Sequence, residues 1–297
     1  MEQQILGAVQ SLTGSEKKIL DELPYVCYEI FVRSFWDSNG DGIGDLCGIT
    51  EQLNYLKELG VGAVSLSPVC TSPSYHKYDV IDFREIDPDY GTLEDYKILI
   101  QEAHQRGMKV FKDLVIHHTS NQHPWFLESQ KGSQNPYRDY YIWLAPETIA
   151  SQNLTIREKT SDSLLSNPWH SLGDPQGEKY YGMFWSGMPD LNFNNPKVQR
   201  EIFDIAKFWI ETGVDGFRLD AAKHIYPPWE GVLKNHDFWE AFRSELEQYK
   251  PDLYLVGEVW ATPEKIAPYF EGIKANFNFS LTTALQQLWS RGEDADL

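Results

Sequence analysis

The 297-residue sequence has little cysteine and no long apolar run, and each scarcity excludes a class of protein. Three cysteines, Cys27, Cys47 and Cys70, are too few for a disulfide framework, and their spacing fits no metal site. We expect Cys27 and Cys70, which lie in strand-like segments, to be buried thiols. No segment approaches the roughly 18 apolar residues of a membrane-spanning helix. No basic segment followed by an apolar one opens the chain, so we expect a cytoplasmic protein, or a secreted one if its N-terminus has been trimmed.

Basic residues are also scarce, because 26 Lys and Arg face 44 Asp and Glu, for a net charge of −18. Nucleic acids and anionic membranes are bound by basic surfaces, so we exclude both as partners. Aromatic residues, in contrast, make up 14% of the chain. Aromatic faces stack on sugar rings but also fill large cores, so this composition permits a carbohydrate enzyme without requiring one. Nothing in the sequence indicates the oligomeric state.

Strand and helix patterns alternate along most of the chain. Apolar, β-rich segments predict strands at 25–33, 61–69, 108–118, 214–220, 253–259 and, more weakly, 275–281. Helical periodicity, caps and terminal glycines predict helices at 50–59, 92–107, 195–213, 236–249 and about 263–272. The alternation predicts an α/β fold, a (β/α)8 TIM barrel. A doubly wound sheet is the alternative, disfavoured because no G-x-G-x-x-G follows a strand.

The periodicity fails between residues 119 and 194, where Ser, Asn, Pro, Trp and Tyr are frequent. A structureless insert of this length is unusual, so we predict an inserted lobe after the third strand. The predicted domains are the first part of the barrel at 1–118, with an N-terminal extension of about 1–24, the lobe at 119–194, and the barrel continuation at 195–297. These segments supply about six of eight βα units. We therefore expect the native protein to continue past Leu297.

A run of oxygen-bearing residues alternating with glycine follows the first predicted strand. Glycines let such a loop wrap around a cation, and oxygen ligands suit Ca²⁺. An EF-hand loop would have glutamate at its twelfth position, where this chain has Gly48. We predict a Ca²⁺ site of another kind, with the carbonyl of Ile43 and the side chains of Asp37, Asn39, Asp41 and Asp45 as ligands. The alternative is a metal-free loop built from Asx turns.

Two predicted strands end in carboxylates, at the edge where barrel enzymes place their chemistry. Arg218 and Asp220 are two residues apart and share one face of their strand. The cation is expected to lower the pKa of Asp220 and keep it ionised, as a nucleophile requires. Glu258 lies among apolar and aromatic neighbours, which favour the protonated carboxyl of a general acid. The pair fits a glycosidase, although two structural carboxylates that cap helices are the alternative.

Several motifs now point the same way. The sequence resembles the α-amylase family over nearly its whole length, and the motifs occur in the family's order. They are DSNGDGIGD (37–45), YHKYDV (75–80), KDLVIHHTS (112–120), MPDLN (188–192), GFRLDAAKH (216–224) and GEVW (257–260). The MPDLN form is the one seen between amylases and oligo-1,6-glucosidases. The family's remaining motif, a His-Asp pair, is expected beyond residue 297.

The resemblance implies that Asp220 is the nucleophile and Glu258 the acid/base. It also implies a set of substrate-binding residues: Tyr78 and Asp79 at the glucose being cleaved, His118 and Arg218 beside it, and Lys223 and His224 toward the leaving group. Asp113 is expected to be structural. It and His118 have opposite parity on one strand, so His118 should lie past the strand end or after a bulge. The KDLVIHHTS motif has His117 at the position where many amylases have a calcium-binding Asn. The resemblance therefore leaves a second calcium site undecided.

Three functions are compatible with these residues. The first is a retaining hydrolase that cleaves α-1,4-glucosidic bonds in starch or maltodextrins. The second is an oligo-1,6-glucosidase or an α-glucosyl transferase of the same family. In the family a valine after the nucleophile accompanies α-1,6 cleavage, whereas this chain has Ala221, which favours the first. The third is a non-catalytic, carrier-type relative, disfavoured because both carboxylates are present. The expected partner is an α-glucan, and the expected cofactor is Ca²⁺.

Overall fold

The computed structural model describes residues 26–154, 167–174 and 176–291. The predicted N-terminal extension, about residues 1–24, lies outside the described residues. Within the described ranges, no helix combines the length and the apolar character needed to cross a membrane.

The central element is a parallel sheet whose strands follow one another in chain order, as a (β/α) barrel requires. Every neighbouring pair in it is parallel. Its strands are β1 (Cys27–Ile30), β2 (Ala63–Leu66), β5 (Lys109–Leu114), β9 (Gly216–Leu219), β10 (Tyr254–Gly257) and β11 (Ala275–Asn276). The predicted order of βα units is confirmed through the described residues.

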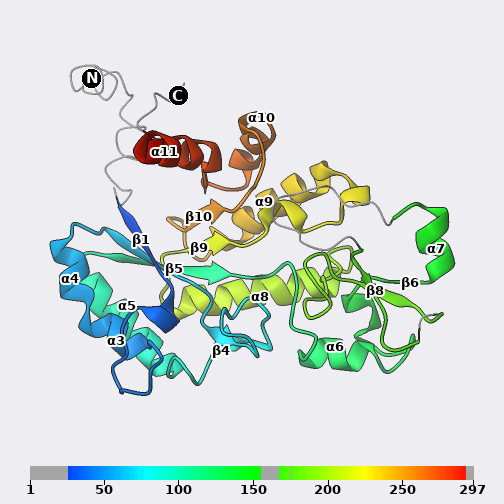
Figure 1. Ribbon diagram of the computed structural model, residues 1–297, viewed down its shortest axis with the longest axis horizontal. Coiled ribbons are helices and arrows are strands. Elements are labelled where there is room, and N and C mark those ends of the chain that lie inside the picture. The colour runs from blue at the N-terminus through cyan, green and yellow to red at the C-terminus, as the bar shows by residue number, and fades with distance from the viewer. Residues whose placement is uncertain (1–25, 155–166, 175, 292–297) are drawn as a thin grey trace.

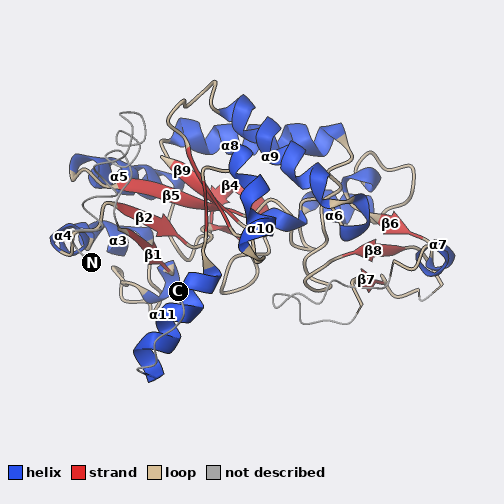
Figure 2. Ribbon diagram, turned by 90° about the horizontal axis from the view of Figure 1, so that it is seen from above, coloured by secondary structure: helices blue, strands red, loops and turns tan. Residues whose placement is uncertain are grey.

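Helices connect these strands and cover the sheet (Figures 1 and 2). The main helices are α3 (Leu46–Glu51), α4 (Leu53–Glu58), α5 (Leu93–Gln105), α8 (Pro196–Thr212), α9 (Val232–Leu246), α10 (Pro263–Ile266) and α11 (Phe279–Arg291). The 3-10 turns between these elements are η1 (Val32–Ser34), η3 (Ala222–His224), η4 (Pro228–Glu230) and η5 (Ala267–Glu271). An antiparallel pair, β3 (Cys70–Thr71) with β4 (Asp82–Ile86), lies between β2 and α5 and was not predicted.

The ends of the long helices follow the caps read from the sequence. Thr92 and Asp95 form a reciprocal capping box at the start of α5. Asn195 accepts a hydrogen bond from the backbone of Lys197 at the start of α8, and Gly213 ends that helix with φ of 116°, a conformation that favours glycine. Local chemistry therefore fixes where these two helices begin and where α8 stops.

The region between β5 and α8 folds mostly apart from the parallel sheet (Figure 2). Its elements are α6 (Pro124–Ser129), η2 (Arg138–Tyr140), β6 (Trp143–Leu144), α7 (Pro146–Ser151), β7 (Trp169–His170) and β8 (Lys179–Tyr181). The strands form an antiparallel sheet in the order β6-β8-β7, beside a small cluster of buried apolar residues. Figure 2 shows this lobe to one side of the parallel sheet.

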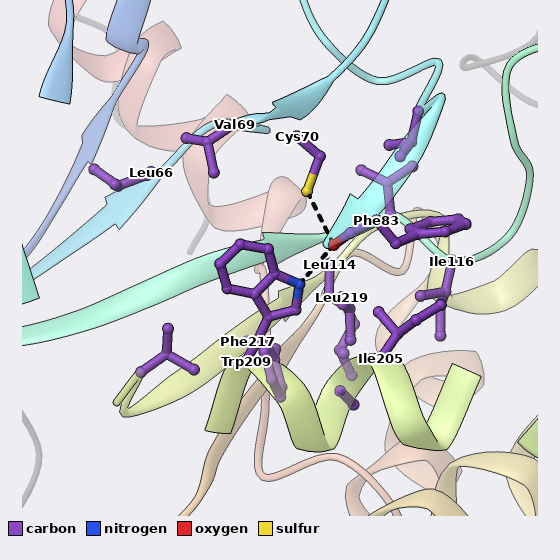
Figure 3. Close-up of a cluster of buried hydrophobic side chains, with 14 of the residues drawn as sticks. Leu66, Val69, Cys70, Phe83, Leu114, Ile116, Ile205, Trp209, Phe217 and Leu219 are labelled. Carbon is purple, nitrogen blue, oxygen red and sulfur yellow. Dashed lines mark hydrogen bonds between the residues drawn. The ribbon is translucent and has the colours of Figure 1, made fainter. Parts of the chain in front are cut away.

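The main core lies between the sheet and α8. Figure 3 shows Leu114, Phe217 and Leu219 from the sheet near Ile205 and Trp209 of the helix. The Trp209 indole is fully buried, and its Nε1 donates to the carbonyl of Phe83 in β4 at 2.9 Å. A buried indole needs such a partner, so this bond ties β4 to α8.

Some predicted details are wrong. The weak strand at 275–281 stops at Asn276, because α11 begins at Phe279. The helix predicted at 50–59 is two short helices that meet at Gln52. Cys70 is buried as expected, but Cys27 is exposed, since strand β1 lies at the edge of the described sheet.

Candidate active site

A cavity of about 530 Å³ lies at the carboxyl ends of the parallel strands. Strands β9 and β10 deliver Arg218, Asp220 and Glu258 to its wall, and the loop before β4 delivers Tyr78. The full lining is His76, Tyr78, His118, Phe184, Trp185, Met188, Arg218, Asp220, Ala221, Glu258 and Trp260. The structure thus gathers five of the sequence-predicted residues, Tyr78, His118, Arg218, Asp220 and Glu258, in one place.

The guanidinium of Arg218 joins three carboxylates. Its Nη1 donates to Asp220 Oδ1 at 2.7 Å and to both oxygens of Asp113 at 2.8 Å, and its Nη2 donates to Glu258 Oε2. The Tyr78 hydroxyl adds a bond to Asp113 Oδ2 at 3.2 Å. Asp113, expected to be structural, therefore competes with the two catalytic candidates for one cation.

Burial and this sharing together raise the pKa of Asp220. Burial raises the pKa of Asp220 to about 7, and Arg218 opposes that rise only in part, because Asp113 and Glu258 act in the other direction. Burial likewise raises the pKa of Asp113 despite its contact with Arg218. The pKa of Asp220 is thus raised rather than lowered as expected, because burial outweighs the attraction of a cation shared with two other carboxylates.

His118 lies past the end of β5, which stops at Leu114. It pairs in a short antiparallel bridge with Asp190 of the MPDLN motif, which explains the parity conflict between Asp113 and His118. Its Nε2 lies 3.1 Å from the carbonyl of Tyr78, so it must donate there. Burial, assisted by His117, lowers the pKa of His118 to about 3, so this side chain is neutral at neutral pH.

Asp79 is not among the residues that line the cavity, and its predicted contact with the glucose stays a prediction. The side chain is buried, and its Oδ1 accepts hydrogen bonds from the hydroxyls of Ser72 and Ser74. His76, which does line the cavity, has its Nδ1 4.0 Å from the same oxygen. Lys77, just before Tyr78, has φ of 64°, in the left-handed region that non-glycine residues rarely adopt.

Comparison with known proteins assigns the chain to a family. The family model described as "Alpha amylase, catalytic domain" matches residues 29–296. The chain belongs to the α-amylase family. An "Alpha-amylase 3" from Dictyoglomus thermophilum is 48% identical over 269 residues, which are 91% of this chain and 50% of that protein. An "Oligo-1,6-glucosidase" from Parageobacillus thermoglucosidasius is 48% identical over 201 residues, 67% of this chain and 35% of its own.

Solved structures show the same relationship. The crystal structure of an alpha-amylase from H. orenii superposes with a TM-score of 0.78 at 52% identity, covering 88% of this chain and 52% of that one. The chain thus spans about half the length of the amylases it matches. Over the matched part, the α-amylase TIM-barrel fold is established for this protein.

Lys223 and His224 of this α-amylase-family chain lie beside the catalytic cavity rather than in it. They line an adjoining cavity of about 650 Å³, together with Val259 and Trp260. The Lys223 Nζ donates to the carbonyl of Trp260 at 2.9 Å. Because Trp260 lines both cavities, the adjoining space is where the predicted leaving-group side would extend.

Sequence reasoning missed several residues of the site. Phe184, Trp185 and Met188 come from the inserted lobe and close one side of the cavity. The aromatic run just before MPDLN was the available indication, because the motif places Asp190 next to His118. His117 carries a further link, with its Nε2 3.1 Å from Asp190 Oδ2.

The loop predicted to bind calcium contains oxygen donors of the types that this ion prefers. Its carboxylates accept backbone hydrogen bonds, from Gly40 and Gly42 to Asp37 and from Ile43 to Asp41. Asp45 instead caps α3 and accepts from Ser38. Among the described residues, no group of three or more His, Cys, Asp or Glu side chains is placed to hold a metal. The calcium site stays a prediction.

Proposed function

We propose that this protein is a retaining glycoside hydrolase that cleaves α-1,4-glucosidic bonds in starch or maltodextrins. The observation that carries the proposal is the joint hold of Arg218 on Asp220 and Glu258 in a cavity with aromatic walls. The relatives named as amylases support an α-glucan as the substrate.

The proposed mechanism has two steps. In the first, Glu258 transfers its proton to the glycosidic oxygen while Asp220 attacks the anomeric carbon, so the bond to the leaving sugar breaks and a glycosyl ester forms. In the second, Glu258 takes a proton from water, whose oxygen attacks the same carbon and releases Asp220. Each step inverts the anomeric centre, so the product keeps the α configuration.

The geometry is compatible with a retaining mechanism. Retaining pairs have carboxyl groups about 5–5.5 Å apart, whereas inverting pairs need ~6.5–9.5 Å to admit a water. Asp220 and Glu258 accept hydrogen bonds from the two terminal nitrogens of the same guanidinium. A single planar group that reaches both carboxylates is compatible with the shorter separation.

The linkage preference rests on Ala221, which follows the nucleophile and lines the cavity with φ of 48°. A β-branched residue is disfavoured in this backbone conformation, so alanine leaves both space and a tolerated geometry. The relative named as an oligo-1,6-glucosidase keeps α-1,6 cleavage as a second candidate.

Product analysis tests the proposal. The full-length protein, incubated with starch, pullulan and isomaltose, is expected to shorten starch and leave isomaltose intact, with the first product released as the α-anomer in NMR spectra recorded before mutarotation. Cleavage of isomaltose in preference to starch would select the second candidate, and products longer than the substrate would indicate transfer. A β-anomer would contradict the assignment of Asp220 as the nucleophile.

We also propose that the loop from Asp37 to Asp45 binds Ca²⁺. An ion bound only by the folded protein adds about 2.7 kcal/mol at 100 times its Kd, so chelation should lower the Tm by roughly 5–10 °C. Asp41→Asn keeps an oxygen for the bond from Ile43 but removes a charge, so it should shrink the chelation effect. Asp252→Asn, at an exposed carboxylate elsewhere, should leave it unchanged. A Tm that changes with neither Ca²⁺ nor chelator would contradict the proposed site.

A further inference from the structure

Trp260 occupies an unusual place between the two cavities. It follows β10, lines both spaces, and leaves 40% of its surface exposed. Its Nε1 donates to Glu258 Oε1 at 2.9 Å. The indole also stacks on the ring of Phe279, with centroids 3.6 Å apart and planes at 12°. An exposed indole is thus held against the carboxylate of the candidate acid/base.

The hydrogen bonds at Glu258 fit its ionised state better than its protonated state. Oε1 accepts from Trp260 and Oε2 accepts from Arg218. A carboxylate accepts at both oxygens, whereas a protonated carboxyl carries a donor on one of them. The arrangement therefore fits the base form of Glu258, which the second step of the proposed mechanism needs.

Arg218 and Trp260 differ in how readily each can release its hydrogen bond to Glu258. Arg218 also holds Asp113 and Asp220, and its side chain is only 13% exposed. Trp260 donates to Glu258 through its indole Nε1 and faces the open cavities. The oxygen freed for a proton in the acid form is therefore Oε1, on the side of the adjoining cavity.

We propose that Trp260 is a positioning residue for Glu258, whose indole N–H stabilises the ionised carboxylate and directs the catalytic proton to Oε1. The inference rests on the proposed function, because it concerns how the acid/base alternates between its two forms. It goes further by naming the group that sets this alternation.

Other groups around Glu258 also carry or exchange charge. They come from β5, β9, the segments that follow these two strands, and the loop before β4. They are Asp113, Arg218, Asp220, Tyr78, His76 and His118, together with Lys223, which donates to the carbonyl of Trp260. Of the two side chains described above as donors to Glu258, Arg218 is charged and Trp260 is uncharged. Replacing it with phenylalanine therefore alters one hydrogen bond and leaves the formal charge of the site unchanged.

The first test observes the indole directly and needs no substrate. In protein labelled with ¹⁵N-tryptophan, the Trp260 resonance is identified by its loss in Trp260→Phe. We expect this resonance to move with pH as Glu258 takes up its proton, and to stop moving in Glu258→Gln. A resonance that titrates identically in Glu258→Gln would overturn the proposal.

The second test is the pH dependence of kcat/KM. Loss of a donor to the ionised form should shift the basic limb of Trp260→Phe upward by roughly 1 pH unit, since a hydrogen bond to a charged group is among the stronger ones. Trp36→Phe is the matched control. Trp36 is 47% exposed and its Nε1 donates to Glu51 Oε2 at 3.1 Å, away from the cavity, so its profile should match the wild type.

The outcomes separate this inference from the proposed function. If Trp260→Phe lowers kcat while the basic limb stays in place, Trp260 only packs and the inference is wrong, although the hydrolase proposal survives. If the wild type cleaves no α-glucan, the proposed function fails, and the NMR titration alone then decides whether Trp260 controls the protonation of Glu258.

Discussion

Asp220→Asn is expected to reduce α-glucan hydrolysis by at least about 10⁴-fold, because an amide cannot form the glycosyl ester on which both steps depend. Asparagine can still accept the bond that Arg218 Nη1 makes to Oδ1, so the fold should be preserved. Mass spectrometry with an activated fluorinated glycosyl donor checks this directly. The wild type should gain the mass of one sugar, and the variant should not.

The same substitution should not destabilise the protein. Burial raises the pKa of Asp220 from 3.8, its value in the unfolded chain, to about 7. Ionising this carboxyl in the folded protein therefore lowers the free energy of unfolding as the pH rises from 3.8 toward 7. The amide removes that cost, so the Tm of the variant should equal or exceed that of the wild type, with the larger gain above pH 7. A variant that loses activity only because it unfolds would not support the assignment.

Glu258→Gln is the matched control for the chemistry. It cannot donate a proton, so hydrolysis of starch should fall steeply, whereas glycosylation by a donor whose leaving group needs no proton should proceed. Asp220→Asn should fail with both substrates. If the two variants respond alike to the activated donor, the separate roles of nucleophile and acid/base are wrong.

Arg218→Met should be the most damaging single change to stability. It leaves three carboxylates without the guanidinium that contacts all of them. Removing one partner of a buried ion pair typically costs about 3–5 kcal/mol. The pKa of Asp220 should also rise further, so the acid limb of kcat/KM should move to higher pH. Denaturant unfolding and the pH profile measure these two effects.

A second substitution distinguishes charge from shape in this cluster. Asp113→Asn added to Arg218→Met removes one of the uncompensated carboxylates, so part of the lost unfolding free energy should return. Activity should not return, because Asp220 and Glu258 still lack the group that holds them. If the double variant is no more stable than Arg218→Met, repulsion among the carboxylates does not account for the lost unfolding free energy.

Much of the architecture could be predicted from local patterns. Alternating strands and helices indicated the barrel, and the caps at Thr92 and Asn195 gave two helix starts, because both depend on residues close together in the chain. Where the pattern was short it failed, as at Asn276, where a strand gives way to α11. Two-residue strands carry too little periodicity to be separated from the helix that follows.

The candidate site, like the architecture, could be predicted from the sequence only in part. The sequence by itself determined which side chains could do the chemistry, since Arg218, Asp220 and Glu258 follow strands whose ends must meet in a barrel. Only the tertiary structure decided which contacts these side chains make and how they share charge. It turned Asp79 toward Ser72, and it made Asp113 share Arg218 with the catalytic pair. Burial and shared charge depend on segments distant in sequence, which no local pattern records.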